Sequence, residues 1–322
     1  MRFVIFTIST LFLLMGCSSQ DEGPFPQENI SIIIPYGPGG GFDTTVRVFA
    51  PHFARQFEAD ITVLPENQPG AGGRRGSASV YRAEPDGYTL GIFNLPGFVL
   101  PSILGERVDY ELRELSWIGR IESQPYVLVV AADSDIYSID DLMALDQVSF
   151  LSTGYGSTVL PAMQIAADVL GLMEKDPIFL AGYPGTADYL VGLIRGDGNV
   201  ALVPPSSAGN YIESGDLRVL AITGETSPFE GVPTFAELGY PELTGLDLQR
   251  SLAGPPNMDP ELLATLREAF QRTVSDPEFL AAAEKARMDV APLSGDATAA
   301  EVDTSFSYYE RYKANLKNPN AM

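Results

Sequence analysis

The sequence has 322 residues and a strong acidic excess, because 42 Asp and Glu residues face 20 Lys and Arg residues and the net charge is −22. No basic cluster of the kind that follows a phosphate backbone occurs, which argues against a nucleic-acid-binding protein. The single histidine, His52, and the single cysteine, Cys17, offer neither a zinc site nor the usual nucleophile–histidine pair of a hydrolase. We therefore predict no catalytic residue, no metal and no cofactor.

The N-terminus has the pattern of a secretion signal. Met1 and Arg2 precede the apolar stretch Phe3–Met15, which is too short to span a bilayer as a mature helix. The following LMGCS sequence resembles the lipobox of bacterial lipoproteins, so we predict that residues 1–17 form the signal, which ends at a lipid-modified Cys17. Residues 18–29 are polar and contain two prolines, which predicts a flexible tether. The expected location is periplasmic or otherwise extracytoplasmic, anchored to a membrane.

From residue 30 to 122 the hydrophobic pattern alternates between strands and helices, as in an α/β domain with a parallel sheet. We predict strands at 31–35, 61–64, 88–93 and 116–122, with helices at 43–57 and 73–83 between them. Pro51 lies within the first helix and should kink it or end it early.

The first strand is followed by a glycine-rich loop, PYGPGGGFD at 35–43, that leads directly into the first helix. A helix N-terminus presents unpaired N–H groups and a positive dipole end, which together suit a carboxylate or phosphate. Such loops also join strands to helices without binding anything, and that alternative stays open. A dinucleotide site is disfavoured because Phe42 stands where the fingerprint needs its third glycine. Arg74 and Arg75, after a second glycine turn, are further candidates to bind an anion or are simply solvated.

A second α/β unit follows, with predicted strands at 126–131, 148–151, 177–180 and 200–203 and helices at 138–145, 157–170 and 185–195. Turn-rich loops at 152–157, 182–186 and 204–207 precede its helices, so several helix N-termini should face one sheet edge. The chain then has a strand at 217–223 and helices at 260–274, 277–287 and 297–315. We expect residues 30–122 and 246–322 to form domain 1, residues 123–245 to form domain 2, and a ligand cleft to lie between them.

Six motifs occur in an order found in a known family. They are PYGPGGGFD at 35–43, PENQPGAGG at 65–73, PDGYTL at 85–90, YPGTA at 183–187, GDLRVLA at 215–221 and VPTFAELG at 232–239. By these motifs the chain resembles the tripartite tricarboxylate transporter substrate-binding proteins, also called the Bug family. The resemblance implies a type II periplasmic binding-protein fold, in which two α/β domains close on a ligand like a hinged trap.

The resemblance also implies a function and a set of ligand-binding residues. The ligand would be a di- or tricarboxylate or a related organic acid, delivered by a monomeric receptor to a membrane permease; an alternative is a sensory module that presents its ligand to a histidine-kinase ectodomain. The implied residues are Tyr36, Gly40, Gly41, Asp43, Asn67, Ala71 and Gly72 from the first domain and Thr153, Gly156, Ser157, Tyr183, Gly185 and Thr186 from the second. Asp43 could instead cap N–H groups at the helix N-terminus, and Tyr36 could equally be a packed aromatic at the rim.

Overall fold

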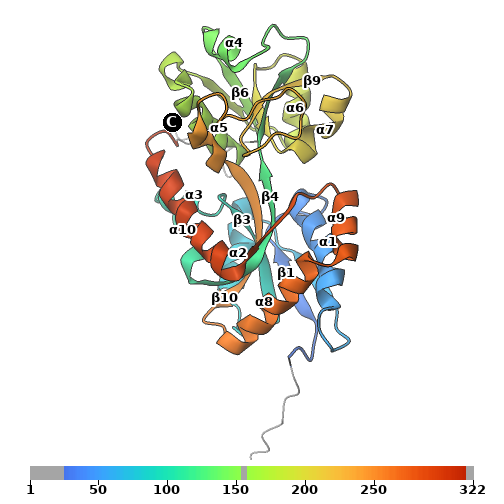
Figure 1. Cartoon of the computed structure of the whole chain (residues 1–322). Coiled ribbons are helices and arrows are strands. Elements are labelled where there is room, and N and C mark those ends of the chain that lie inside the picture. The colour runs from blue at the N-terminus through green and yellow to red at the C-terminus, as the bar shows by residue number, and fades with distance from the viewer. Residues whose placement is uncertain (1–24, 154–157, 317–322) are drawn as a thin grey trace, which may run out of the picture.

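The protein folds into two lobes, which Figure 1 shows one above the other. The structure, a computed structural model, describes residues 25–153 and 158–316. The lower lobe in Figure 1 is built on one six-stranded sheet. Its strands, in spatial order, are β11 (Val290–Ser294), β4 (Leu115–Pro125), β10 (Asp247–Pro256), β3 (Thr89–Leu95), β1 (Ile30–Ile34) and β2 (Val63–Asn67).

Helices cover both faces of this sheet, as the run of isoleucines in β1 requires. Ile32 and Ile34 pack into one apolar core and Ile33 into another, because successive side chains of a strand point to opposite faces. The first core is closed by α1 (Gly41–Ala54), α8 (Pro260–Val274) and α9 (Pro277–Lys285). The second is closed by α2 (Arg74–Tyr81), α3 (Leu100–Ile103) and α10 (Gly295–Arg311) and continues into the upper lobe.

Helix α1 shows how the sequence sets these contacts. Its apolar residues Val46, Phe49, Ala50 and Phe53 recur with helical spacing and are all buried. The ring of Phe49 packs 5.9 Å from those of Phe270 and Phe279, which anchors α1 to α8 and α9. The helix ends at Ala54, three residues after Pro51 and short of the predicted end at residue 57.

The upper lobe holds two smaller sheets. One has the order β8 (Ala201–Val203), β5 (Val127–Ala131) and β9 (Leu217–Ile222), and the other pairs β6 (Ser149–Ser152) with β7 (Ile178–Ala181). Its helices are α4 (Ile139–Ala144), α5 (Val159–Val169), α6 (Thr186–Ile194) and α7 (Pro205–Glu213). Four 3-10 turns complete the described elements: η1 (Ala71–Gly73), η2 (Leu112–Glu114), η3 (Leu172–Lys175) and η4 (Pro241–Gly245).

The chain passes between the lobes twice. Strand β4 ends at Pro125 and β5 begins at Val127, and Figure 1 shows β4 running from the lower lobe toward the upper one. The return lies between the end of β9 and the start of β10 at Asp247. Within the described residues, no helix is both long and apolar enough to cross a membrane.

The predicted parallel pairing within residues 30–122 is found between β1 and its neighbours β2 and β3, but the large sheet is mixed, and five of the eight strand pairings among the described residues are antiparallel. β10 runs antiparallel to β3 and β4, β11 runs antiparallel to β4, and β5 runs antiparallel to both β8 and β9. The alternation of strands and helices predicts only the parallel pairing within βαβ units. It does not predict the direction of strands such as β10 and β11, which join the sheet after the chain has crossed to the other lobe and returned. Strands β10 and β11 were also missed by the sequence reading.

Candidate functional site

The carboxyl ends of four strands lie at one edge of the large sheet, the edge nearest the upper lobe. β1 pairs in parallel with β2 and β3, while β10 is antiparallel to both β3 and β4. Tyr36, Asn67 and Asn94 therefore come together at this edge, beside the N-terminal half of β10. In α/β proteins this is the edge where ligands bind.

The β1–α1 loop is held by Asp43, whose side chain is 6% exposed. Its Oδ2 accepts from the Gly39 N–H at 2.9 Å and from Arg47 Nε at 2.9 Å, and its Oδ1 accepts from Asn67 Nδ2 at 3.0 Å. These bonds, that from Arg47 foremost, lower the pKa of Asp43 to about 2. Asp43 thus has a structural role, since it reaches back from the first turn of α1 to fix the loop, although the N–H group that it binds belongs to Gly39, outside the helix.

The β2–α2 loop is pressed against Tyr36 by an unusual backbone. Gly70, Ala71, Gly72 and Gly73 all have positive φ, and Ala71 adopts a left-handed φ of 50° despite its side chain. A Cβ at Gly73 would lie 2.7 Å from the Phe98 ring and 3.3 Å from the ring of Tyr36. Only glycine permits this approach, so the loop that carries Ala71 and Gly72 is placed directly beside Tyr36.

Tyr36 is a packed aromatic with a polar tip. Its ring stacks on Phe98, with centroids 6.1 Å apart and planes 8° apart, and lies 4.8 Å from the ring of Phe42. Its hydroxyl oxygen accepts a hydrogen bond from Asn94 Nδ2 at 3.0 Å, and burial raises its pKa to about 12. The hydroxyl therefore stays protonated at neutral pH, and its O–H is left as a donor.

A buried ion pair beneath the glycine loop was missed by the sequence reading. Arg250 on β10 is paired across the sheet with Asn94 of β3 on one side and Glu122 of β4 on the other. Its Nη1 lies 3.0 Å from Glu122 Oε2, with the two side chains 8% and 0% exposed. Thr45 of α1 also hydrogen-bonds this carboxylate.

The guanidinium of Arg250 reaches the first turn of α1. Its Cζ lies 4.9 Å from the centroid of the Phe42 ring, and a Cβ at Gly41 would collide with Nη2 and stand 3.2 Å from Cζ. The Nε is buried without a hydrogen-bond partner among the described residues. Gly41 is thus required for a positive side chain to lie against a helix N-terminus, two features that both favour an anion.

The match of the chain to one family model shows its family. The family model described as "Tripartite tricarboxylate transporter family receptor" matches residues 46–304. The chain belongs to this family. Its members are periplasmic solute-binding receptors and not enzymes.

Individual proteins similar to this receptor agree in sequence and in fold. A "UPF0065 protein in gbd 5′ region" from Cupriavidus necator is 29% identical over 262 residues, 79% of this chain and 77% of that protein. A TctC solute-binding protein from Polaromonas has a TM-score of 0.76 at 24% identity, with 91% and 100% of the chains covered.

Two of the similar structures hold a dicarboxylate. The Rhodopseudomonas palustris protein MatC with bound malate has a TM-score of 0.74 at 19% identity, with 90% and 100% of the chains covered. A second R. palustris protein, with adipate, has a TM-score of 0.73 at 19% identity, with 91% and 98% covered. At this identity both likenesses bear on the fold, which is that of a periplasmic binding protein.

The upper lobe of the receptor meets the same edge through Tyr126 and the start of α5. Tyr126 donates to Thr158 Oγ1 at 3.0 Å, and a Cβ at Gly97 would lie 2.8 Å from Thr158 Cγ2 and 2.5 Å from Asn94 Nδ2. Burial raises the pKa of Tyr126, so its hydroxyl is neutral as well. Thr158 therefore touches the lower lobe beside Asn94, a contact that no sequence motif indicates.

Not every predicted residue of the upper lobe has its polar group at this edge. Gly185 caps α6 and Thr186 opens it, while Thr153 follows β6 directly. The hydroxyl of Tyr183, however, donates to Asp197 Oδ2 at 2.9 Å, beyond the C-terminal end of α6. It points away from the helix N-terminus that it was predicted to accompany. Gly156 and Ser157 lie outside the described residues.

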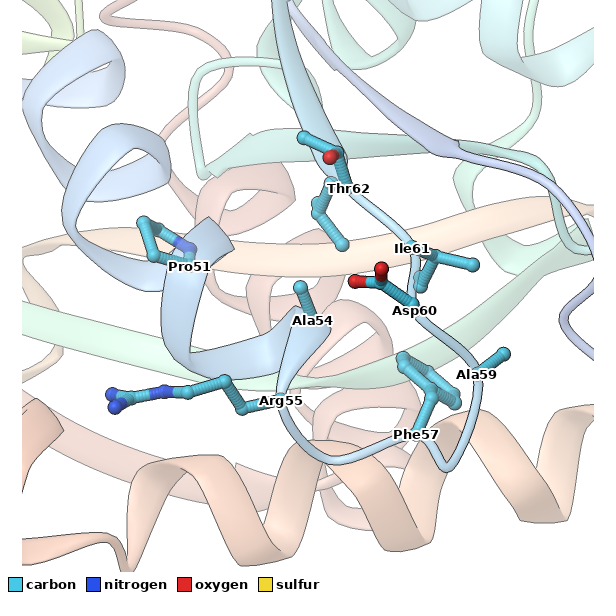
Figure 2. Close-up of a pocket in the computed structure, with 9 residues that line it drawn as sticks. Pro51, Ala54, Arg55, Phe57, Ala59, Asp60, Ile61 and Thr62 are labelled. Atoms are coloured by element: carbon cyan, nitrogen blue, oxygen red, sulfur yellow. The ribbon is translucent and has the colours of Figure 1, made fainter.

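A separate cavity of about 340 Å³ lies at the other end of α1 and β2 (Figure 2). It is lined by Pro51, Ala54, Phe57 and the segment 59–63, with Arg55 and Asp60 as its charged residues. Arg55 forms an ion pair with Glu278 at 2.6 Å, so its charge is compensated. The cavity is thus remote from Gly41 and Asn67, at opposite ends of the same elements. The described residues contain no cluster of side chains suited to a metal ion.

Proposed function

We propose that this receptor captures a small organic acid with two or three carboxylates between its lobes. The observation that carries the proposal is the position of Arg250, whose guanidinium lies against the N-terminal turn of α1. One carboxylate of the ligand would bind there, close to the hydroxyl of Tyr36 and the amide of Asn94. The backbone of Gly40 and Gly41 would supply N–H donors from the helix end.

Local donors have to overcome the field of an acidic protein. A net charge of −22 repels carboxylates at long range, but this repulsion between exposed charges is screened beyond about 8–10 Å at physiological salt. A guanidinium and a helix N-terminus act within hydrogen-bond distance in a partly dry site, where their effect is much stronger. Glu122 already compensates one edge of Arg250, so we expect recognition by hydrogen bonds as much as by net charge.

The second carboxylate would meet the upper lobe. Thr153, Gly185 and Thr186 stand at the ends of strands or the start of a helix there, and Gly156 and Ser157 belong to the same predicted set. We assign Asn67, Asp43, Ala71 and Gly72 the task of shaping the lower half of the site. The bound malate and adipate of the two similar R. palustris structures support a dicarboxylate as the ligand class.

The wider role follows from the family. We propose that the receptor has two domains that move about the two passages at β4 and β10. Domain 1 comprises residues 30–122 and 246–322, and domain 2 comprises residues 123–245. The loaded receptor would dock on a permease of the tripartite tricarboxylate type, while Cys17 carries a lipid anchor and residues 18–29 act as its tether.

Thermal unfolding tests the ligand class directly. The protein that begins after Cys17 keeps every residue the structure describes, and it should be stripped of bound ligand by partial unfolding and refolding. A ligand that binds only the folded state adds about 2.7 kcal/mol at a hundred times its dissociation constant, a shift of several degrees. We expect such a shift with a few di- or tricarboxylates and none with the matching amides or with nucleotides. A response to nucleotides, or to no carboxylate at all, would overturn the proposal.

A further inference from the structure

Four arginines gather around one cavity on the lower lobe, in a protein with only 20 basic residues. The cavity has a volume of about 460 Å³ and is lined by α2 and by the segment after α3. Its lining residues are Ala71, Arg74, Arg75, Ala78, Arg82, Arg107, Val108 and Asp109.

The helix geometry explains why the cavity stays open. Arg74, Ala78 and Arg82 follow one another at intervals of one turn, so they share a face of α2 and of its C-terminal cap. Ala78 is 7% exposed, and its single methyl group leaves the space between the two long side chains unfilled. The volume lies within the range of small-molecule sites.

Two of the four arginines are held in place by carboxylates. Arg74 forms an ion pair with Glu106, and its Nε also donates to the Ala71 carbonyl at 2.9 Å. Arg82 Nη2 lies 2.8 Å from Asp109 Oδ2. These bonds keep two guanidinium groups at the rim of the cavity in defined positions.

The other two arginines have no carboxylate partner among the described residues. Arg75 is exposed, with its stem packed on Gly70, and Arg107 is exposed on the segment that follows α3. Four guanidinium groups against Glu106 and Asp109 leave two net positive charges around one cavity. Like charges that line one cavity repel one another, and a bound anion would relieve that repulsion.

We infer that this cavity, which we call the arginine cavity, is a second anion-binding site that takes a small dianion, either a dicarboxylate or a phosphate group. The charge of the ligand follows from the two uncompensated guanidinium groups, and the planar fork of arginine fits the oxygens of both groups. The site goes beyond the proposed function because it lies on the α2 face and uses neither Arg250 nor the β1–α1 loop. Of the residues that line the cavity, Ala71 is the one that we also assign to the site between the lobes.

The arginine Nε–Hε resonances of the protein that begins after Cys17 provide the test, at mildly acidic pH and low temperature. The probes are malonate and inorganic phosphate, with acetate and chloride at matched ionic strength as monoanions. We expect saturable shifts of the signals that disappear in the variant Arg75→Glu/Arg107→Glu. The dianions should bind at least about tenfold more tightly than acetate, and the variant should lose this binding.

The control is Lys285→Glu/Arg311→Glu, which changes the net charge equally at two exposed positions elsewhere and should retain dianion binding. Shifts that never saturate, that chloride reproduces, or that the control variant also loses would overturn the inference. Binding to phosphatidylglycerol vesicles without any response to the free dianions would overturn it too.

The thermal response to carboxylates separates this site from the proposed function. The Arg75→Glu/Arg107→Glu variant should keep the stabilisation by the ligand that binds between the lobes. If the dianions cause no saturable resonance shifts in the parent protein but carboxylates still stabilise it, only the arginine cavity is refuted. If carboxylates do not stabilise the parent protein but the resonance shifts occur, only the proposed function is refuted.

Discussion

The ion pair between Arg250 and Glu122 makes a prediction that connects stability with ligand binding. Replacing Arg250 by Met leaves the carboxylate of Glu122, which is 0% exposed, with Thr45 as its remaining partner. Removing one member of a buried ion pair costs about 3–5 kcal/mol, because the other charge stays desolvated. Replacing Glu122 by Gln as well removes both charges, so the double variant should lose only about 1–2 kcal/mol.

Urea unfolding of the parent, the two single variants and the double variant measures this coupling. We expect a coupling free energy of at least ~2 kcal/mol. The control cycle uses Arg113→Met and Asp303→Asn, an ion pair at 2.7 Å whose side chains are 48% and 68% exposed. Exposed pairs contribute about 0–1 kcal/mol. Equal coupling in the two cycles would show that burial does not strengthen the pair between Arg250 and Glu122.

The same double variant tests ligand binding without loss of the fold. If Arg250 binds a carboxylate of the ligand, the double variant should bind the carboxylate identified by thermal unfolding at least about tenfold more weakly. The variant of the control pair should bind it normally. Unchanged affinity in the folded double variant would refute the assignment of Arg250, while leaving the rest of the site untouched.

Three further results are expected. Asp43→Asn should lower the free energy of unfolding by about 1 kcal/mol at neutral pH. The pKa of Asp43 is lowered from 3.8 to about 2, but the stabilisation that this shift implies is reduced because Arg47 is exposed. The difference between variant and parent should vanish as pH falls from about 4 toward 2. Burial raises the pKa of Asp247 to about 6, so its pH dependence has the opposite sign. The free energy of unfolding of the parent should rise by up to about 2 kcal/mol as pH falls from neutral to about 4, and urea titrations should find this rise absent in Asp247→Asn. Gly73→Ala should lower the free energy of unfolding by about 2–4 kcal/mol, because the new methyl group would clash with a ring at a left-handed backbone position. Gly105→Ala, where φ is 75° and the space is open, should cost only about 1 kcal/mol. Equal losses on urea unfolding would contradict the close packing at Gly73.

Local patterns in the sequence predicted the elements that rest on local physics. The glycine loop before α1 and the second glycine turn, before α2, each depend on neighbouring residues, and each occurs where the pattern indicated. The alternation of strands and helices likewise indicated an α/β fold, and the ordered motifs indicated the family. Such features need only the chain within a few residues of each position.

The chemistry beneath the loop was decided by the tertiary structure alone. Glu122 and Arg250 are 128 positions apart, and they meet because β10 returns from the upper lobe and inserts between β3 and β4. Asn94 joins them only through the pairing register of three strands. The hydroxyl of Tyr183 likewise turned away from its predicted place because Asp197 accepts its hydrogen bond. A sequence pattern has a period of a few residues, so it can place a side chain on a face, but which distant side chain stands opposite is fixed by strand order and register.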